Sequence, residues 1–188
     1  MSRTALIVID MLNAYEHPDA EQLTRSVEQS LPAMEQLIRR AAEEDVLTIY
    51  VNDNFGAWTS DRHELVQTAL NGRFGHLVEP IAPADDTMFV VKARHPIFFQ
   101  TPLEYLLGQE GVDRVVLIGQ VTEQCVLYSA LDAYVRHLEV VVPRDAVAHI
   151  DEHLADASLE LMERNMDADV CTADDCRRTT QAPEGDRV

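Results

Sequence analysis

Short apolar runs alternate with amphipathic segments along nearly the whole chain. Residues 5–9 and 115–118 contain only apolar side chains, which is typical of parallel strands covered on both faces. Residues 126–135 instead carry apolar side chains every three or four positions, as expected for a helix with one buried face. This alternation predicts an α/β fold in which a doubly wound parallel sheet has helices on both faces.

Six strands and five helices follow from these patterns. We expect the strands near residues 4–9, 46–52, 87–91, 114–119, 138–142 and 168–171. We expect the helices near residues 22–43, 61–71, 101–109, 123–136 and 151–165. Right-handed crossovers would place the first and fourth strands side by side and open a crevice where the strand order reverses.

Length and composition fit one globular domain, which we place at residues 1–176. The chain has 188 residues, of which 46% are hydrophobic and 26% are charged, enough to bury a substantial core. Residues 177–188 are mostly polar or charged and include Pro183 and Gly185. We therefore expect a disordered C-terminal tail.

Charge and cysteine content narrow the class of protein. The formal net charge is −18, from 33 acidic and 15 basic residues, which argues against nucleic acid or an anionic membrane as a partner. The sequence carries no run typical of a signal peptide or a membrane span. Three cysteines do not make a disulfide framework, so we expect a cytoplasmic protein.

Cys125 lies where a buried strand is expected to turn into a helix. Gly119 ends the apolar run, and helical spacing begins at Thr122, so Cys125 falls in the first helical turn. Free backbone N–H groups and the helix dipole favour a thiolate there, which makes Cys125 a candidate nucleophile. A small buried hydrophobic residue is the alternative interpretation.

Two charged residues end other predicted strands. Asp10 follows the apolar run 5–9, and Lys92 follows the run 88–91. Open α/β sheets place their sites at the carboxyl ends of the strands. If the three strands are parallel and adjacent, Asp10, Lys92 and Cys125 converge on one crevice. Taken singly, Asp10 also fits a turn residue and Lys92 a solvated side chain.

Three segments resemble the isochorismatase-like cysteine hydrolases, a superfamily that includes nicotinamidases and carbamoylsarcosine amidases. They are residues 8–13 (Val-Ile-Asp-Met-Leu-Asn), 91–94 (Val-Lys-Ala-Arg) and 119–126 (Gly-Gln-Val-Thr-Glu-Gln-Cys-Val). The resemblance implies a Rossmann-like three-layer α/β/α sandwich with a six-stranded parallel sheet. It also implies a catalytic triad of Asp10, Lys92 and Cys125.

The same resemblance implies a cis peptide bond between Gln120 and Val121. That geometry would aim the N–H groups of Val121 and Cys125 at one point, as an oxyanion hole. Asp10 would accept the thiol proton and Lys92 would stabilise the negative charges. The sulfur would then attack an amide carbonyl and form a thioester that water hydrolyses, with no cofactor.

The segment after the second strand departs from the nicotinamidase pattern. Those relatives hold a metal through an Asp-x-His pair and a further histidine, whereas Asn54 follows Asp53 here. A neutral amide is a poor ligand for ions of the Zn²⁺ type. His63 and His76 lie downstream but also fit ordinary surface positions. We expect no metal site.

Aromatic and polar residues near the strand ends are candidates for substrate binding. Phe55 and Trp58 could line a pocket for a flat or apolar group, although both also fit the core. Asn13, Arg94 and Gln120 are candidates for polar contacts.

The sequence therefore predicts a metal-independent cysteine hydrolase that cleaves the amide-type C–N bond of a small amide or ureide. One alternative is an isochorismatase-type enzyme that cleaves a vinyl ether, although such relatives commonly lack the nucleophilic cysteine. Another is a binding protein that keeps the scaffold without turnover. By resemblance we also expect a homodimer or homotetramer.

Overall fold

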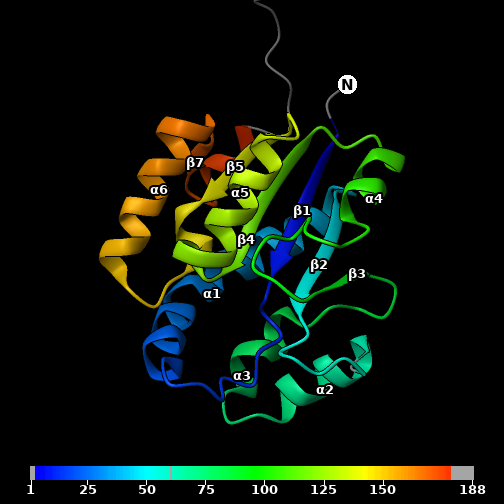
Figure 1. The fold of residues 1–188 in the computed structure, drawn as a ribbon, viewed down its shortest axis with the longest axis vertical. Helices are drawn as coiled ribbons and strands as arrows, with labels where there is room; N and C mark the ends of the chain where they lie inside the picture. Colours follow the sequence, from blue (N-terminus) through cyan, green and yellow to red (C-terminus); the bar gives the residue numbers. More distant parts are fainter. Residues whose placement is uncertain (1–2, 60, 179–188) are drawn as a thin grey trace, which may run out of the picture.

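A parallel sheet runs through the centre of the molecule (Figure 1), in a computed structural model that describes residues 3–59 and 61–178. Its strands are β1 (Thr4–Ile9), β2 (Leu47–Asp53), β3 (Met88–Lys92), β4 (Arg114–Gln120), β5 (Glu139–Pro143), β6 (Val147–Ala148) and β7 (Asp169–Cys171). The order is β3-β2-β1-β4-β5-β7, and β6 pairs with β4. All the pairs are parallel, which confirms the predicted fold class.

Helices cover both faces of the sheet and make the molecule a three-layer sandwich. They are α1 (Ala20–Glu43), α2 (Arg62–Asn71), α3 (Gly75–Val78), α4 (Leu103–Gln109), α5 (Leu127–Tyr134) and α6 (Glu152–Met166), with the short helices η1 (Glu79–Ile81), η2 (Thr122–Val126), η3 (Arg144–Ala146) and η4 (Asp175–Arg178). Among the described helices, none is long and apolar enough to cross a membrane.

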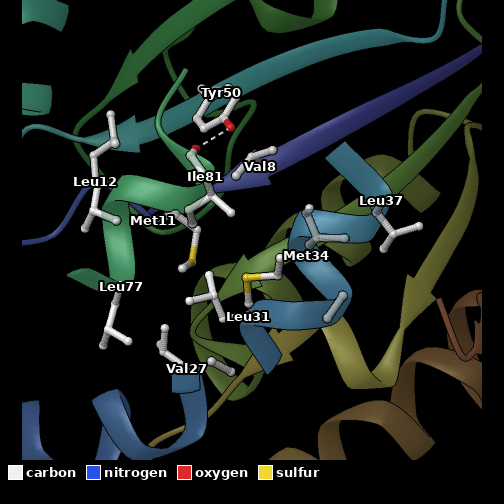
Figure 2. Close-up of a cluster of buried hydrophobic side chains, with 14 of the residues drawn as sticks. Val8, Met11, Leu12, Val27, Leu31, Met34, Leu37, Tyr50, Leu77 and Ile81 are labelled. Carbon is white, nitrogen blue, oxygen red and sulfur yellow. Dashed lines mark hydrogen bonds between the residues drawn. The ribbon is translucent and has the colours of Figure 1, made fainter. Parts of the chain in front are cut away.

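Successive side chains of each strand enter two separate cores. Leu6 and Val8 of β1 pack with α1, α3 and η1, whereas Ile7 and Ile9 pack with α4, α5 and α6. Figure 2 shows the first core, in which the Tyr50 hydroxyl donates to the Ile81 carbonyl at 2.6 Å. Since side chains alternate between the faces of a strand, a strand buried on both sides must be apolar throughout.

The six predicted strands form one path through the sheet, and among the described residues a seventh strand, β6, lies off this path. The additional strand β6 has only two residues, Val147 and Ala148, and pairs with the end of β4. A strand of that length has no alternating pattern for sequence reasoning to detect. The predicted tail overlaps η4 by two residues, 177 and 178, and residues 179–188 lie outside the described chain.

Gly119 allows β1 and β4 to approach each other just below the strand ends. It pairs with Ile9 and has a φ of +114°. A Cβ atom at this position would lie 2.2 Å from the Ile9 carbonyl oxygen, far inside van der Waals contact. A side chain here would therefore push apart the two strands that lead to Asp10 and to Cys125.

Candidate active site

Asp10 leaves the end of β1 through a left-handed turn. Its φ is +54°, a conformation that aspartate adopts more readily than most residues. Its N–H donates to the Val51 carbonyl at 3.0 Å, and its Oδ1 accepts the Asp53 N–H at 2.7 Å. The end of β2 therefore fixes the orientation of the Asp10 carboxylate.

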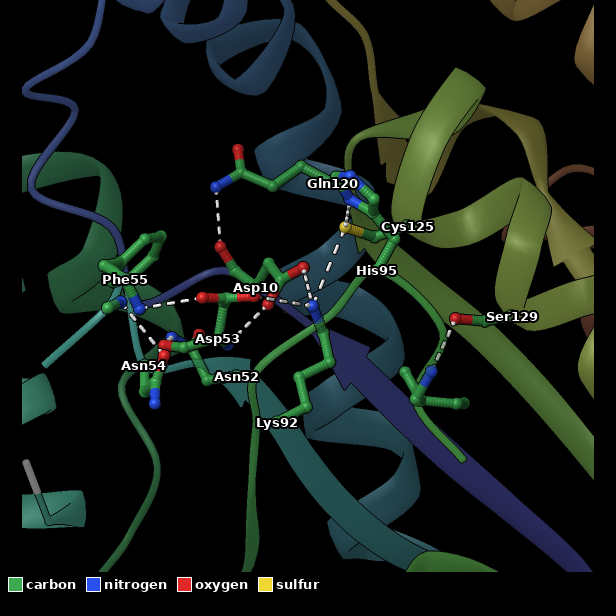
Figure 3. Close-up of polar contacts among 12 residues, drawn as sticks. Asp10, Asn52, Asp53, Asn54, Phe55, Lys92, His95, Gln120, Cys125 and Ser129 are labelled. Carbon is green, nitrogen blue, oxygen red and sulfur yellow. Dashed lines mark hydrogen bonds and ion pairs between the residues drawn. The ribbon is translucent and has the colours of Figure 1, made fainter. Parts of the chain in front are cut away.

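Lys92 is the buried cation to which the other polar groups of the site converge (Figure 3). Its Nζ lies 2.8 Å from Asp10 Oδ2, 3.6 Å from Asp53 Oδ2 and 3.7 Å from Cys125 Sγ, and its side chain has no exposed surface. The three strands are parallel but not adjacent, because β2 lies between β3 and β1. The long lysine side chain spans this separation and brings Asp10, Lys92 and Cys125 together.

Cys125 lies in η2, a π-helical turn between β4 and α5, and is 8% exposed. The Thr122 hydroxyl donates to the Ala148 carbonyl at 3.0 Å, which ties the start of the turn to β6. Glu123 Oε1 accepts the N–H groups of Ile150 and Asp151 at 3.0 and 2.9 Å. The Thr-Glu part of the motif thus holds the turn in place and leaves the sulfur to face Asp10 and Lys92.

The electrostatics of the sulfur differ from the prediction of a thiolate. Burial, together with the negative charge of Asp10, raises the pKa of the Cys125 thiol, and Lys92 only partly offsets this. Burial also raises the pKa of Asp10, against the lowering effects of Lys92 and of its hydrogen bond with Cys125. The expected helix-end effect on the Cys125 pKa is therefore outweighed by burial and by the charge of the neighbouring Asp10 carboxylate.

Lys92 keeps its proton in this setting. Burial lowers its pKa, but the charge of Asp10 and the hydrogen bond from Lys92 to Asp10 raise it, and the net result is a pKa above the usual value. The ammonium group can therefore stabilise negative charge on either the carboxylate or the sulfur.

His95 is a neighbour of the sulfur that the sequence analysis missed. Its Nδ1 lies 3.3 Å from Cys125 Sγ, and its exposed ring packs against Tyr128 with centroids 5.7 Å apart. The available signal was its place three residues after Lys92, in the loop that follows β3.

The peptide bond between Gln120 and Val121 is cis, and the Val121 N–H donates to the Cys125 sulfur. The side chain of Gln120 is buried, and it donates to the Asp10 carbonyl at 2.6 Å and accepts from the Tyr15 hydroxyl at 3.3 Å. Both ends of the Gln120 amide are thus engaged within the fold, and its role as a substrate contact stays a prediction.

The other predicted substrate-binding residues lie in two cavities. Asn13 and Phe55 line one of about 400 Å³, and Trp58 and Arg94 line another of about 390 Å³. Asn54 and Ala57 line both cavities. The Trp58 side chain is 82% exposed, so it forms part of an open wall and not of the core.

Comparison with known proteins places the chain among hydrolases of one family. The family model described as the isochorismatase domain matches residues 4–175. The chain belongs to the isochorismatase family. An isochorismatase family protein of Bacillus subtilis is 31% identical over 168 residues, which cover 89% of this chain and 93% of that protein.

Amidases occur among the relatives of this isochorismatase-like hydrolase. Maleamate amidohydrolase of Pseudomonas putida is 27% identical over 81% of this chain and 76% of its own length. The crystal structure of N-carbamoylsarcosine amidase from Thermoplasma acidophilum has a TM-score of 0.70 at 25% identity and covers 97% of this chain and 99% of its own. The family and fold named by the resemblance are thereby confirmed.

Asp53, the last residue of β2, and Asn54, which follows it, do not fit the metal site expected for a nicotinamidase. Asp53 Oδ1 accepts the Phe55 N–H at 2.7 Å, and Asp53 Oδ2 faces Lys92. Asn54 Oδ1 accepts the Gly56 N–H at 3.0 Å. The side-chain oxygen atoms that could ligate a metal therefore already make contacts within the fold. Within residues 3–59 and 61–178, no group of three or more histidine, cysteine or acidic side chains could hold a metal ion.

Proposed function

We propose that this protein is a cysteine amidohydrolase that cleaves the C–N bond of a small amide or ureide through a thioester. The observation that carries the proposal is the contact of one buried cation, Lys92, with both the Asp10 carboxylate and the Cys125 sulfur, at 2.8 and 3.7 Å. A nucleophile beside a base that a third group orients is the general arrangement for covalent acyl transfer.

In the acylation step, Asp10 takes the proton from the Cys125 thiol as the sulfur attacks the substrate carbonyl carbon. The carbonyl oxygen becomes an oxyanion, which the N–H groups of Val121 and Cys125 stabilise. When the C–N bond breaks, Asp10 returns the proton to the leaving nitrogen, and the amine or ammonia departs. The acyl group remains on Cys125 as a thioester.

In the deacylation step, Asp10 is again a carboxylate and removes a proton from a water molecule. The resulting hydroxide attacks the thioester carbonyl, the C–S bond breaks, and the thiolate regains the proton from Asp10. Lys92 remains protonated throughout and lowers the energy of each anionic state. The chain's own groups supply every proton transfer. Asp53 Oδ1 and Asn54 Oδ1, which a metal would need as ligands, accept hydrogen bonds from the backbone.

The walls of the site favour a small substrate. Asn13 and Arg94 offer an amide and a guanidinium group at the two cavities, and Phe55 and Trp58 offer apolar surface. Small carboxamides and ureides match this combination of aromatic walls and few polar anchors. The amidase relatives are a reason to start the substrate search with maleamate and N-carbamoylsarcosine.

The test is release of ammonia from a panel of small amides and ureides by the wild type and by Cys125→Ala. We expect the variant to lose nearly all turnover, because it has no sulfur to form the thioester. Cys171→Ser is the matched control, since it removes another thiol outside the site and should keep full activity. Intact-mass spectrometry with an electrophilic amide analogue should find the adduct on Cys125.

Two other outcomes would replace the proposal. Cleavage of isochorismate that persists in Cys125→Ala would identify a vinyl ether hydrolase that uses Asp10 without the sulfur. Absence of both turnover and adduct in the folded wild type, despite saturable binding of small amides, would identify a binding protein on the same scaffold. Light scattering on the same samples tests the expected homodimer or homotetramer.

A further inference from the structure

Two further sulfurs lie in contact at the β7 edge of the sheet, in a place unrelated to the proposed chemistry. Cys171 is the last residue of β7, and Cys176 lies in η4. Their Sγ atoms are 2.9 Å apart. A disulfide bond measures about 2.05 Å, so the two sulfurs need to close by only about 0.9 Å to form one.

The turn between the two cysteines is already fixed in the conformation that brings them together. The Cys176 N–H donates to the Thr172 carbonyl at 3.1 Å. Two residues from outside the turn also bind it. Asp145 Oδ1 accepts the Ala173 N–H at 2.8 Å, and the Arg40 side chain donates to the Ala173 carbonyl at 3.0 Å. Because contacts with η3 and α1 hold the turn, little further ordering is needed to bring the sulfurs into bonding range.

The two thiols differ in exposure and in charge. Cys171 is partly exposed, whereas Cys176 is buried in the first core. A hydrogen bond joins the two sulfurs, and either can be its donor; this contact lowers the pKa of Cys171, against the raising effects of burial and of Asp169, Asp145 and Asp175. An accessible thiol in contact with a buried one matches the pairing of an attacking cysteine with a resolving cysteine.

The surroundings also select the oxidant. The carboxylates of Asp145, Asp169 and Asp175 act on the Cys171 sulfur, and the whole chain carries a net charge of −18. An anionic reagent such as glutathione disulfide is repelled from this surface. A small neutral peroxide is not repelled.

We propose that Cys171 and Cys176 are a modification site at which hydrogen peroxide forms a reversible disulfide. The Cys171 thiolate attacks one peroxide oxygen, the O–O bond breaks, and hydroxide leaves, giving a sulfenic acid. The Cys176 sulfur then attacks the Cys171 sulfur, the S–O bond breaks, and water leaves with the thiol proton. The two thiols lose two electrons in total, and one peroxide is reduced to two waters.

The proposed disulfide is separate from the catalytic sulfur. The other two cysteines of the chain contact each other, so Cys125 has no cysteine beside it and cannot reach the same reversible state. The disulfide is expected to fasten η4 to the edge strand β7 and to leave Asp10, Lys92 and Cys125 in place. This inference therefore holds or fails independently of the proposed amidase activity.

The test treats the full chain carrying Cys125→Ser with hydrogen peroxide and maps its peptides without reduction. We expect a Cys171–Cys176 disulfide that dithiothreitol reverses, and a melting temperature about 5 °C higher in the oxidised form. Adding Cys176→Ser should leave a sulfenic acid on Cys171 that dimedone traps. Circular dichroism checks that each variant is folded.

Three results would overturn the proposal. They are two unmodified thiols after peroxide treatment of the folded chain, disulfides only between separate molecules, and equal rates of oxidation by peroxide and by glutathione disulfide. Since the Cys125→Ser background has no nucleophile in the site, none of these results depends on whether the wild type hydrolyses amides.

Discussion

The inner and outer halves of the site are built differently. The inner half consists of Asp10, Lys92 and Cys125, which are buried and held by ion pairs and hydrogen bonds. The outer half includes Trp58 and Arg94, which are exposed and line an open cavity. The difference teaches that the proposed reaction would depend on buried charges held in place by the fold, whereas the substrate would meet exposed side chains that can change without affecting the fold.

Asp10→Asn is the sharpest test of the inner half. Asparagine keeps the size of the side chain but cannot accept the thiol proton, so kcat/KM should fall by about 10²–10⁴-fold. The control is Asp61→Asn, which changes an exposed carboxylate that caps α2 through the Glu64 N–H and lies outside the site. Steady-state ammonia release measures both variants, and an Asp10→Asn enzyme within tenfold of the wild type would contradict the assigned role.

Lys92→Met tests how far the inner half depends on its cation. The substitution leaves the Asp10 carboxylate buried without its partner at 2.8 Å, so the free energy of unfolding at neutral pH should fall by about 3–5 kcal/mol. Urea denaturation gives this value. Arg164→Gln, which breaks an ion pair between exposed residues of α6, should cost no more than about 1 kcal/mol. Equal losses in the two variants would remove the distinction between buried and exposed charge.

The pH dependence follows from Asp10. Burial raises its pKa above the usual 3.8, and only the carboxylate accepts a proton, so kcat/KM should rise with pH along an acidic limb that lies above pH 3.8. The free energy of unfolding should change in the opposite direction and fall as the pH rises. Neutral Asp10 contributes stability that is fully present below pH 3.8 and is lost as the pH rises through the raised pKa. Rate profiles and urea midpoints over the same pH range measure both effects, and an acidic limb at or below pH 3.8 would be inconsistent with them.

His95→Asn tests the boundary between the two halves. His95 Nδ1 lies 3.3 Å from the sulfur, and the loss of one hydrogen bond to a charged sulfur, about 1.5 kcal/mol, should lower kcat by about tenfold. Tyr128→Phe is the control, because it keeps the ring that packs against His95 and should change kcat by less than about twofold. Unchanged kcat in His95→Asn would assign the histidine to the surface alone.

Trp58→Ala tests the outer half and should have the smallest effect. Loss of an aromatic wall should raise KM by about five- to tenfold and leave kcat unchanged, and stability should stay within about 0.5 kcal/mol because the side chain is 82% exposed. Tyr105→Ala removes another exposed aromatic side chain, on α4 and outside both cavities, as the control. A loss of kcat with KM unchanged would move Trp58 to the inner half.

Much of the fold could be predicted because buried parallel strands carry a strong local signal. The apolar runs that end at Asp10, Lys92 and Gly119 are strands β1, β3 and β4, each within about a residue of the predicted bounds. The pairing of β1 with β4 followed from crossover handedness. The two-residue strand β6 and the π-helical turn of η2 have no periodicity of their own, because tertiary contacts create them.

The candidate site was predicted in part. Strand-end chemistry and family motifs identified Asp10, Lys92 and Cys125, which the fold does bring together. The state of the sulfur was not predictable, because desolvation and the charge of Asp10 depend on packing around Cys125. For the same reason, the sequence alone could not show that Gln120 is enclosed by the fold or that His95 lies over the sulfur.

The missing side chain at Gly119 has a consequence for how this site tolerates mutation. The close contact of the Gly119 backbone with the Ile9 carbonyl sets the distance between the strands that lead to Asp10 and to Cys125. A single added methyl group there would act as a wedge one residue away from Asp10. A substitution at Gly119 is therefore expected to impair catalysis, although this position carries no functional group.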